Sequence, residues 1–389
     1  MREYDYIITG GGAAGLSLVY YLLHSPLRDK RILIVDKTEK TQNDRTWCFW
    51  EPNAGPFESI VYKSWQHLSF YTQDLERHAT ISPFTYKMIR GIDFYRFVNA
   101  AIEKSKNVDR VYGSVETIVN KEGKVSVTIN GVSYIGRWCF NSILFAPIDK
   151  LNYNYLDQHF KGWVINMKAA RFDPEKATLM DFRLPQQGET RFFYVLPIDQ
   201  HRALVELAIF SNKRWPQEQY DVAIQKYLNL HHNIYKEDFS ILEEEFGVIP
   251  MTDFPFNQRE GRIIHIGTAG GHTKASTGYT FWRMQQALQK MVESMVASGD
   301  PYPAKASNFS RFKLYDSVLL YILEKNILPA DYLFARLFKK NSFSDILKFL
   351  NERTTLTEEL KIVKALPILV FSKVMLKEIW LRLKRKSLY

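Results

Sequence analysis

A run of glycines near the start of the chain constrains the fold more than any other feature of the sequence. A short, β-prone apolar segment at residues 6–9 leads directly into GGGAAG at residues 10–15, which matches the pattern G-x-G-x-x-G. In that pattern the first glycine permits a tight turn, the second lets the backbone approach a pyrophosphate, and the third lets a helix pack against the strand. Residues 16–23 continue as that helix, whose N-terminal N–H groups favour phosphate. The cofactor-binding residues predicted here are Gly10, Gly12, Ala13 and Gly15.

A second apolar segment, residues 31–35, ends at an acid with the spacing expected of a nucleotide site. Asp36 lies 21 residues beyond Gly15, close to the position of a carboxylate that binds a ribose hydroxyl. An acid there favours an adenosine with a free 2′-hydroxyl over one with a 2′-phosphate. We therefore predict a dinucleotide site that includes Asp36 and the adjacent Lys37. A glycine-rich turn without a ligand would not account for Asp36.

A second glycine cluster far downstream favours FAD over NAD as the dinucleotide. Residues 263–266 are predicted to form a strand, a glycine loop follows, and a helix begins around residue 279. A late strand, loop and helix suit an extended flavin cofactor, whose ADP half is held by the first motif. A small NAD domain does not usually need such a unit so much later in the same fold. The predicted cofactor contacts in this segment are Gly267, Gly270, Gly271, Thr277 and Gly278.

Composition limits the class of protein. Of the 389 residues, 46% are hydrophobic, which is ample for a folded core and argues against disorder. The two cysteines, Cys48 and Cys139, predict neither a disulfide framework nor a metal site. No signal peptide precedes the first strand, and no run approaches the roughly 20 apolar residues that span a bilayer. We therefore expect a cytoplasmic protein.

The net charge of +10 is compatible with an ordinary basic protein, a nucleic-acid partner or an anionic membrane surface. No zinc-finger or RNA-recognition signature is present, so we expect no nucleic-acid partner. The last 34 residues contain eight Lys or Arg and three Glu, and an apolar stripe recurs there at Leu376, Ile379, Trp380 and Leu383. Such a basic amphipathic helix suits peripheral attachment to a membrane surface. A helix docked on the domain is the alternative.

Four motifs together resemble the lycopene cyclases, the FAD-dependent carotenoid cyclases of bacteria and plants. They are NDRTWCFW at residues 43–50, the segment at 197–206, FGVIPM at 246–251 and GTAGGHTKASTGYTF at 267–281. The resemblance extends from the N-terminus to about residue 351. NDRTWCFW is its most specific part, because other FAD oxygenases share the glycines but not that string.

The resemblance implies an α/β fold of the flavin hydroxylase type. In that fold a Rossmann-like FAD-binding domain carries an inserted β-rich substrate domain, and here a helical C-terminal region follows. The expected FAD-binding domain comprises residues 1–75, 95–150 and 258–300; the substrate-binding domain comprises 76–94 and 151–257; the C-terminal region comprises 301–389.

The resemblance also implies a reaction. A lycopene β-cyclase protonates the terminal double bond of a linear ψ-end of lycopene or a related carotenoid. The resulting cation closes to a β-ionone ring and loses a proton, giving γ-carotene and β-carotene without net redox change. The family uses reduced FAD, for which NAD(P)H is the expected electron source. Two alternatives are a monooxygenase or polyprenyl reductase on the same fold, and a non-catalytic membrane-associated protein that binds flavin and carotenoid.

Glu206 is the predicted catalytic acid. The family's essential glutamate lies in a motif that reads FLEET in plants, and its first glutamate matches Glu206, whereas Leu207 and Ala208 depart from it. RALVELAIF also reads as a strand in which Glu206 shares a face with Leu204 and Ala208. If that face lines an apolar cavity, burial raises the pKa of the carboxyl and keeps it protonated. A solvated glutamate on an open strand is the alternative.

Several other residues have two interpretations. Arg45, in the aromatic motif, is predicted to contact the cofactor. The run Glu243–Glu245 is interpreted as a solvated face, although one of its members could line the site. His272 and Lys274 either lie near the flavin or are exposed in the late glycine loop.

Overall fold

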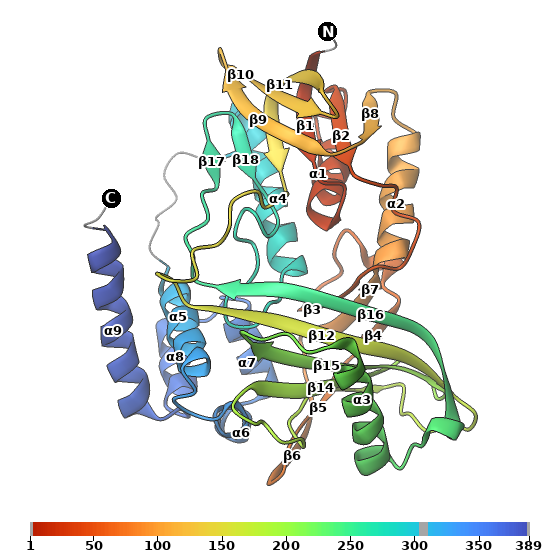
Figure 1. Cartoon of the computed structure of the whole chain (residues 1–389), viewed down its shortest axis with the longest axis vertical. Coiled ribbons are helices and arrows are strands. Elements are labelled where there is room, and N and C mark those ends of the chain that lie inside the picture. Colours follow the sequence, from red (N-terminus) through yellow and green to blue (C-terminus); the bar gives the residue numbers. More distant parts are fainter. Residues whose placement is uncertain (1–2, 303–309, 387–389) are drawn as a thin grey trace.

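The computed structural model describes residues 3–302 and 310–386, so residues 1–2 of the expected FAD-binding domain and 303–309 and 387–389 of the expected C-terminal region lie outside it (Figure 1). Figure 1 shows a sheet with packed helices in the upper half and the long strands of a second sheet crossing the lower half. Helices of the C-terminal region lie beside the second sheet. This arrangement confirms the predicted α/β class with a helical C-terminal region.

The first sheet has a parallel core built around the strand that precedes the glycines. Its strand order is β17-β18-β11-β1-β2-β8, with β1 parallel to both of its neighbours. Strand β2, ILIVD, is a nearly continuous apolar run, as expected when both faces of a parallel sheet are buried. The bounds are β1 (Glu3–Thr9), β2 (Ile32–Asp36), β8 (Val108–Tyr112), β11 (Val132–Asn141), β17 (Arg259–Glu260) and β18 (Ile263–His265).

Different elements cover the two faces of this sheet. Three helices pack on one face, and an antiparallel hairpin that continues from β11 covers the other. The helices are α1 (Ala13–Leu23), α2 (Gly91–Glu103) and α4 (Phe281–Ser298), and the hairpin strands are β9 (Val115–Lys121) and β10 (Lys124–Ile129). Strand β1, the glycine turn and α1 therefore form the predicted βα unit at the centre of a Rossmann-like fold.

The second sheet has seven strands in the order β16-β12-β15-β14-β13-β5-β6, and all neighbours are antiparallel except β13 and β5. The expected domain boundary at residue 75 falls at the start of β6, and the strands before and after this boundary, β5 and β6, pair with one another in this sheet. The bounds are β5 (His67–Thr72), β6 (Leu75–Thr80), β12 (Tyr155–Met167), β13 (Lys176–Asp181), β14 (Thr190–Pro197), β15 (Arg202–Ser211) and β16 (Phe239–Thr252).

Helices cover both faces of the second sheet. Helix α3 (Gln217–His232) packs on one face, and the C-terminal helices lie against the other. Those helices are α5 (Arg311–Glu324), α6 (Ala330–Lys340), α7 (Phe343–Leu350), α8 (Leu356–Val363) and α9 (Ile368–Lys386), and two 3-10 turns occur at Glu58–Ile60 and Lys236–Asp238. Within residues 3–302 and 310–386, no helix combines the length and apolar character required to cross a membrane.

A small sheet joins the two large ones and accounts for the aromatic motif. It consists of β3 (Thr46–Glu51), β7 (Thr85–Arg90) and β4 (Lys63–Trp65) in the order β3-β7-β4. Because side chains alternate along a strand, Trp47 and Phe49 pack into the core beneath the first sheet, whereas Cys48 and Trp50 face the core of the second. The aromatic side chains of β3 therefore pack into both cores and connect them.

A buried ion cluster fixes the C-terminal helices to the late glycine loop. The Lys274 ammonium lies 2.9 Å from Asp316 of α5 and 3.0 Å from Glu352, and Ser276 donates a 2.6 Å hydrogen bond to Asp316. Lys274 is therefore buried, which contradicts the interpretation that it is exposed in the late glycine loop. His272 is also buried; its Nδ1 accepts a hydrogen bond from the Gly267 N–H, and burial lowers its pKa to about 4.

We expect Lys274→Ala to lower the free energy of unfolding by about 3 kcal/mol or more, because it leaves the buried Asp316 carboxylate without its cation. Urea denaturation of the purified protein measures this change. Lys290→Ala, at an exposed position of α4, is the matched control and should change it by less than about 0.5 kcal/mol. Equal effects of the two substitutions would show that the cluster contributes no specific stability.

Candidate active site

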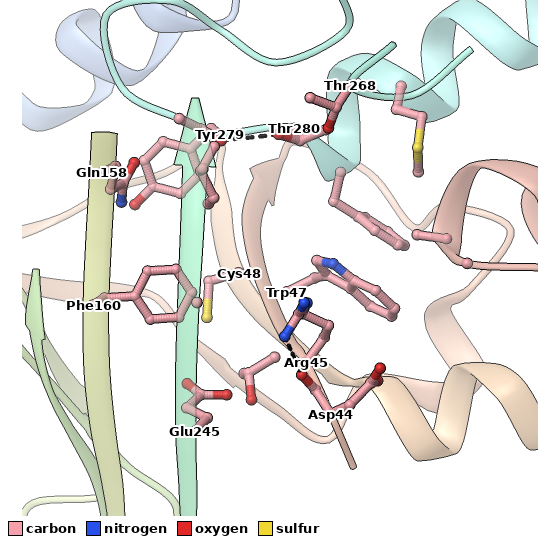
Figure 2. Close-up of a pocket in the computed structure, with 18 of the residues that line it drawn as sticks. Asp44, Arg45, Trp47, Cys48, Gln158, Phe160, Glu245, Thr268, Tyr279 and Thr280 are labelled. Atoms are coloured by element: carbon pink, nitrogen blue, oxygen red, sulfur yellow. Dashed lines mark hydrogen bonds between the residues drawn. The ribbon is translucent and has the colours of Figure 1, made fainter. Parts of the chain in front are cut away.

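A cavity of about 500 Å³ lies between the glycine turn of the first sheet and one face of the second. Figure 2 shows Glu245, Phe160 and Gln158 on the side of the second sheet, with Trp47 and Arg45 opposite them. The cavity therefore runs from the predicted nucleotide end to the strand that carries Glu206. Its length and mixed lining suit a long ligand with polar and apolar ends.

At one end of the cavity, the glycine turn leaves room for a phosphate close to the backbone. Gly12 and Ala13 line the wall at the start of α1, and a Cβ placed on Gly12 would meet no atom within 4 Å. Gly15 packs so closely that a Cβ there would lie 2.0 Å from the Gly10 carbonyl oxygen, while Gly10 itself has a φ of +100°. The turn therefore leaves open space in front of the helix N-terminus, where N–H groups can bind an anion.

Charged residues beyond the turn lie at the same end. The Asp36 carboxylate is so close to Gly11 that a Cβ on that glycine would lie 2.8 Å from it, and Asp36 lines a small space beside the turn rather than the cavity itself. Lys37 is exposed and lines no part of the cavity that the structure describes, whereas Lys40 does line it and lies 4.0 Å from Asp36 and 3.7 Å from Asp44. Lys40 was not predicted, because it belongs to a polar segment without a motif.

The late loop contributes the middle of the cavity. Gly267, Thr277 and Gly278 line it, and Gly278, with a φ of +74°, leaves no room for a Cβ beside Gln158. Gly270 and Gly271 do not line it; a Cβ on Gly270 would lie 2.2 Å from the His265 carbonyl oxygen. These two glycines therefore shape the loop rather than face the cavity.

Two polar atoms on this wall have no protein partner. Gln158 Oε1 and Thr277 Oγ1 are buried and have no hydrogen-bond partner among the residues that the structure describes. Buried polar groups are normally paired, so a bound molecule with hydrogen-bonding groups would satisfy both atoms. Together with the open glycine turn, these atoms fit an extended dinucleotide whose second half lies beside Gln158.

The far end of the cavity holds two carboxyl groups that the sequence did not place together. Glu206 on β15 and Glu245 on β16 both pair with Gly162 of the intervening strand β12, so all three lie in one row across the sheet. Directly paired residues project on the same face. A Cβ on Gly162 would lie 3.2 Å from the Glu206 Cβ and 3.3 Å from the Glu245 Cγ. The missing side chain therefore allows the two carboxyls to approach one another.

Their surroundings give the two carboxyls different properties. Burial raises the pKa of Glu206 well above its usual value, and the adjacent charge of Glu245 and a hydrogen bond between the two carboxyls raise it further. Burial also raises the pKa of Glu245, but the hydrogen bond from Glu206, a second one involving Thr46 and the positive charge of Arg45 oppose the rise. The pKa of Glu206 is therefore raised more strongly than that of Glu245, so Glu206 is the member of the pair that keeps a proton more readily.

Arg45 is held in place by the aromatic motif. Its guanidinium donates a 2.7 Å hydrogen bond to the Asp44 carbonyl (Figure 2). The Asp44 carboxylate accepts a hydrogen bond of 2.7 Å from the Tyr95 hydroxyl. Trp47 stacks on Phe281 with ring centroids 5.4 Å apart. The predicted cofactor residue Arg45 therefore lies at the cavity wall, where it also acts on Glu245.

Aromatic side chains enclose the carboxyl pair. Tyr194 of β14 pairs directly with Glu206 in the sheet, and its hydroxyl lies 3.3 Å from that of Tyr279, which in turn lies 3.3 Å from that of Tyr86. Tyrosine rings present electron-rich faces that attract cations. The site therefore combines a buried proton donor with a wall suited to positive charge. Within residues 3–302 and 310–386, no group of side chains suits a metal ion.

The chain matches the family model described as lycopene cyclase protein over residues 5–376. It therefore belongs to the lycopene cyclase family, and the match continues beyond residue 351, where the sequence resemblance was expected to end. A search of curated protein sequences found no match.

Solved structures with this fold include several flavin enzymes. A geranylgeranyl bacteriochlorophyll reductase-like protein from Thermoplasma acidophilum is 13% identical with a TM-score of 0.66, over 96% of this chain and 99% of that one. A flavoprotein/dehydrogenase from Cytophaga hutchinsonii is 11% identical with a TM-score of 0.66, over 97% and 99%. The halogenase PltM, solved as a variant in complex with FAD, is 14% identical with a TM-score of 0.56, over 90% and 79%. At these identities the likeness concerns the fold.

The raised pKa of Glu206 predicts how stability depends on pH. The folded state keeps a proton that the unfolded state releases above the ordinary glutamate pKa of about 4.3. The free energy of unfolding should therefore fall as pH rises from that value toward the folded pKa, by up to about 1.4 kcal/mol per pH unit. Glu206→Gln should remove most of this slope in urea denaturation, whereas the exposed control Glu39→Gln should keep it. Parallel curves for wild type and Glu206→Gln would contradict the assignment of the proton.

Proposed function

We propose that this protein is a lycopene β-cyclase that uses reduced FAD. The observation that carries the proposal is the contact between the half-buried Glu206 and Glu245 at the end of a dinucleotide-sized cavity, where desolvation and the neighbouring carboxyl raise the pKa of Glu206. The family to which the chain belongs and the fold that it shares with flavin enzymes support the same conclusion. The substrate is the linear ψ-end of lycopene or a related carotenoid.

Glu206 is the proton donor in this proposal. An alkene is a weak base, so its protonation requires a neutral acid held in a site of low polarity, and burial beside Glu245 supplies both conditions. The proton moves from Glu206 to the terminal double bond, and the tertiary cation is attacked by the neighbouring double bond to close a six-membered ring. Loss of a proton from the ring then restores neutrality, and the Glu206 carboxylate recovers the proton.

Glu245 keeps the proton in place and favours the cation. While Glu206 is protonated, Glu245 accepts its hydrogen bond and orients it. After proton transfer the pair carries two negative charges, which attract the cation and draw a proton back from the ring. Arg45 and Thr46 limit the cost of the Glu245 charge. No hydride or electron is consumed in these steps.

Residues along the rest of the cavity would hold FAD. The Gly12 turn would bind the pyrophosphate, Asp36 the ribose, and Thr277 and Gln158 the polar edge of the flavin ring. The reduced flavin supplies an electron-rich ring whose negative charge stabilises positive charge on the substrate. NAD(P)H is the proposed source of its electrons.

The test is to express the wild type, Glu206→Gln and Glu245→Gln in lycopene-accumulating cells and to measure cyclised pigments by chromatography. We expect Glu206→Gln to lose at least about 100-fold in activity with flavin retained, because general acid catalysis contributes about that much. Glu245→Gln removes the charge that raises the pKa of Glu206, so in assays of the purified enzyme its activity should decline at lower pH than that of the wild type.

Three outcomes would contradict this proposal in different ways. Cyclisation that survives Glu206→Gln would exclude Glu206 as the acid. Stoichiometric consumption of NAD(P)H per product would indicate a monooxygenase or polyprenyl reductase. Binding of lycopene without a spectral change by the flavin-loaded wild type would indicate a non-catalytic carotenoid-binding protein.

We also propose that α9 attaches the protein to a membrane surface. Phe371, Val374 and Glu378 of α9 are buried against the body, and Glu378 accepts a 3.2 Å hydrogen bond from Asn154. The apolar stripe predicted from the sequence points away from that contact: Leu376, Trp380 and Leu383 are 70%, 57% and 64% exposed. An exposed apolar face with tryptophan and flanking lysines suits the boundary of an anionic bilayer.

The membrane proposal predicts co-flotation of the purified protein with vesicles that contain anionic phospholipid. The double substitution Leu376→Gln and Trp380→Gln should reduce the bound fraction several-fold by removing apolar contact with the acyl boundary. Val222→Gln and Leu230→Gln together, at similarly exposed apolar positions of α3, form the matched control. If both pairs reduce flotation equally, α9 is not the membrane-binding face.

A further inference from the structure

A second cavity of about 150 Å³ lies between the seven-stranded sheet and the C-terminal helices. Its wall is almost entirely apolar and draws on α5, α6, α7, α8 and α9. Four of the lining side chains are small and polar or charged: Ser276, Thr277, Asp316 and Ser372. Of these, Asp316 and Ser276 are bonded to one another, and Asp316 is also bonded to Lys274. This cavity therefore has the character of a site for a hydrocarbon.

The second cavity adjoins the carboxyl site across a shared wall. Tyr194, Thr277 and Tyr279 line both cavities, and the hydroxyls of Tyr194 and Tyr279 lie 3.3 Å apart. The two spaces are therefore separated by the thickness of these side chains. A linear molecule that has one end at Glu206 and passes this wall enters the apolar space directly.

The second cavity approaches the protein surface at the start of α9, where a lining residue is exposed. Ile368 and Ser372 line the cavity there, and Ile368 is 54% exposed. The adjacent Leu369 is 87% exposed. The mouth therefore opens on the same helix that carries the exposed apolar stripe.

We propose that this second cavity binds the long polyene chain of the substrate while its terminal end reacts at Glu206. The inference rests on the proposed function, because it requires a linear hydrocarbon with a reactive end. Such a substrate is far longer than the carboxyl end of the first cavity, so most of its chain must lie elsewhere. The second cavity is apolar along its length, begins at the tyrosine wall beside the reacting end and ends at an apolar surface.

This arrangement assigns a role to the tyrosine wall. Tyr279 lies between Tyr86 and Tyr194, and a chain that occupies both cavities passes beside these three rings. The rings exclude water from the carboxyl pair when the second cavity is filled. The substrate enters and leaves through the mouth at α9, where apolar surface is available to receive it.

The test fills the second cavity without touching the carboxyl pair. Leu337→Trp on α6 and Leu319→Trp on α5 each place an indole at the cavity wall. Both positions are only partly buried, so the added volume can be accommodated. Leu230→Trp, at an exposed position of α3, is the matched control. Flavin content and melting temperature report folding, and two variants on different helices keep the test valid if one does not fold.

Two substrates separate the proposal from the function on which it rests. Lycopene requires both cavities, whereas a short synthetic polyene with the same ψ-end requires only the first. We expect each filling variant to lose roughly tenfold or more in kcat/KM for lycopene, with the short substrate and the control unchanged. The amount of lycopene bound by the protein with oxidised flavin, which does not turn the substrate over, can be measured by visible absorbance. This amount should also be lower in the filling variants than in the wild type.

The other outcomes are equally informative. If both filling variants fold, bind flavin and still cyclise lycopene as the wild type does, the second cavity does not hold the chain. If the filling variants lose kcat/KM equally for lycopene and for the short substrate, their effect lies at the carboxyl site and the proposal is overturned. If the wild type itself cyclises neither substrate, the proposed function fails independently of the second cavity.

Discussion

Glu206 and Glu245 approach one another because the residue between them in the sheet, Gly162, has no side chain. The rest of the site follows from this contact. Two carboxyls in contact and shielded from water cannot both be ionised at moderate cost. Glu206 keeps a proton more readily, because hydrogen bonds from Glu206 and Thr46 and the positive charge of Arg45 favour the ionised form of Glu245. Without Glu245, the pKa of Glu206 would be lower, because the adjacent carboxyl would no longer raise it.

The two sheets place this pair of carboxyls at the wall of the cavity. The first sheet ends in a glycine turn that faces the cavity, and the second sheet presents the carboxyls on the face toward it. Strand β3 packs into the cores of both sheets through alternate side chains, which holds the two walls at a set separation. The ion cluster around Lys274 fixes the C-terminal helices to the same loop and so shapes the second cavity.

Local patterns predicted some parts of the molecule well and others poorly. The unit from β1 to α1, the strand of Glu206 and the helical tail follow from periodicity and glycine spacing, which act over short stretches of chain. Glu245 was hidden in a run of three acids, of which Glu243 and Glu244 are exposed while Glu245 turns inward. His272 and Lys274 lie in a glycine-rich loop that normally suggests exposure, but both are buried, and Lys274 is paired with Asp316 and Glu352 of the C-terminal region.

The sequence by itself determined that the chain forms a βα dinucleotide-binding unit, that Glu206 occupies one face of a strand, and that α9 has an apolar stripe. These features depend on neighbouring residues and on the steric properties of glycine. Only the tertiary structure decided that Gly162 brings Glu245 to Glu206, that the α9 stripe faces outward, and that a second apolar cavity adjoins the first. Strand register and helix docking join residues far apart in the chain, so no local pattern specifies them.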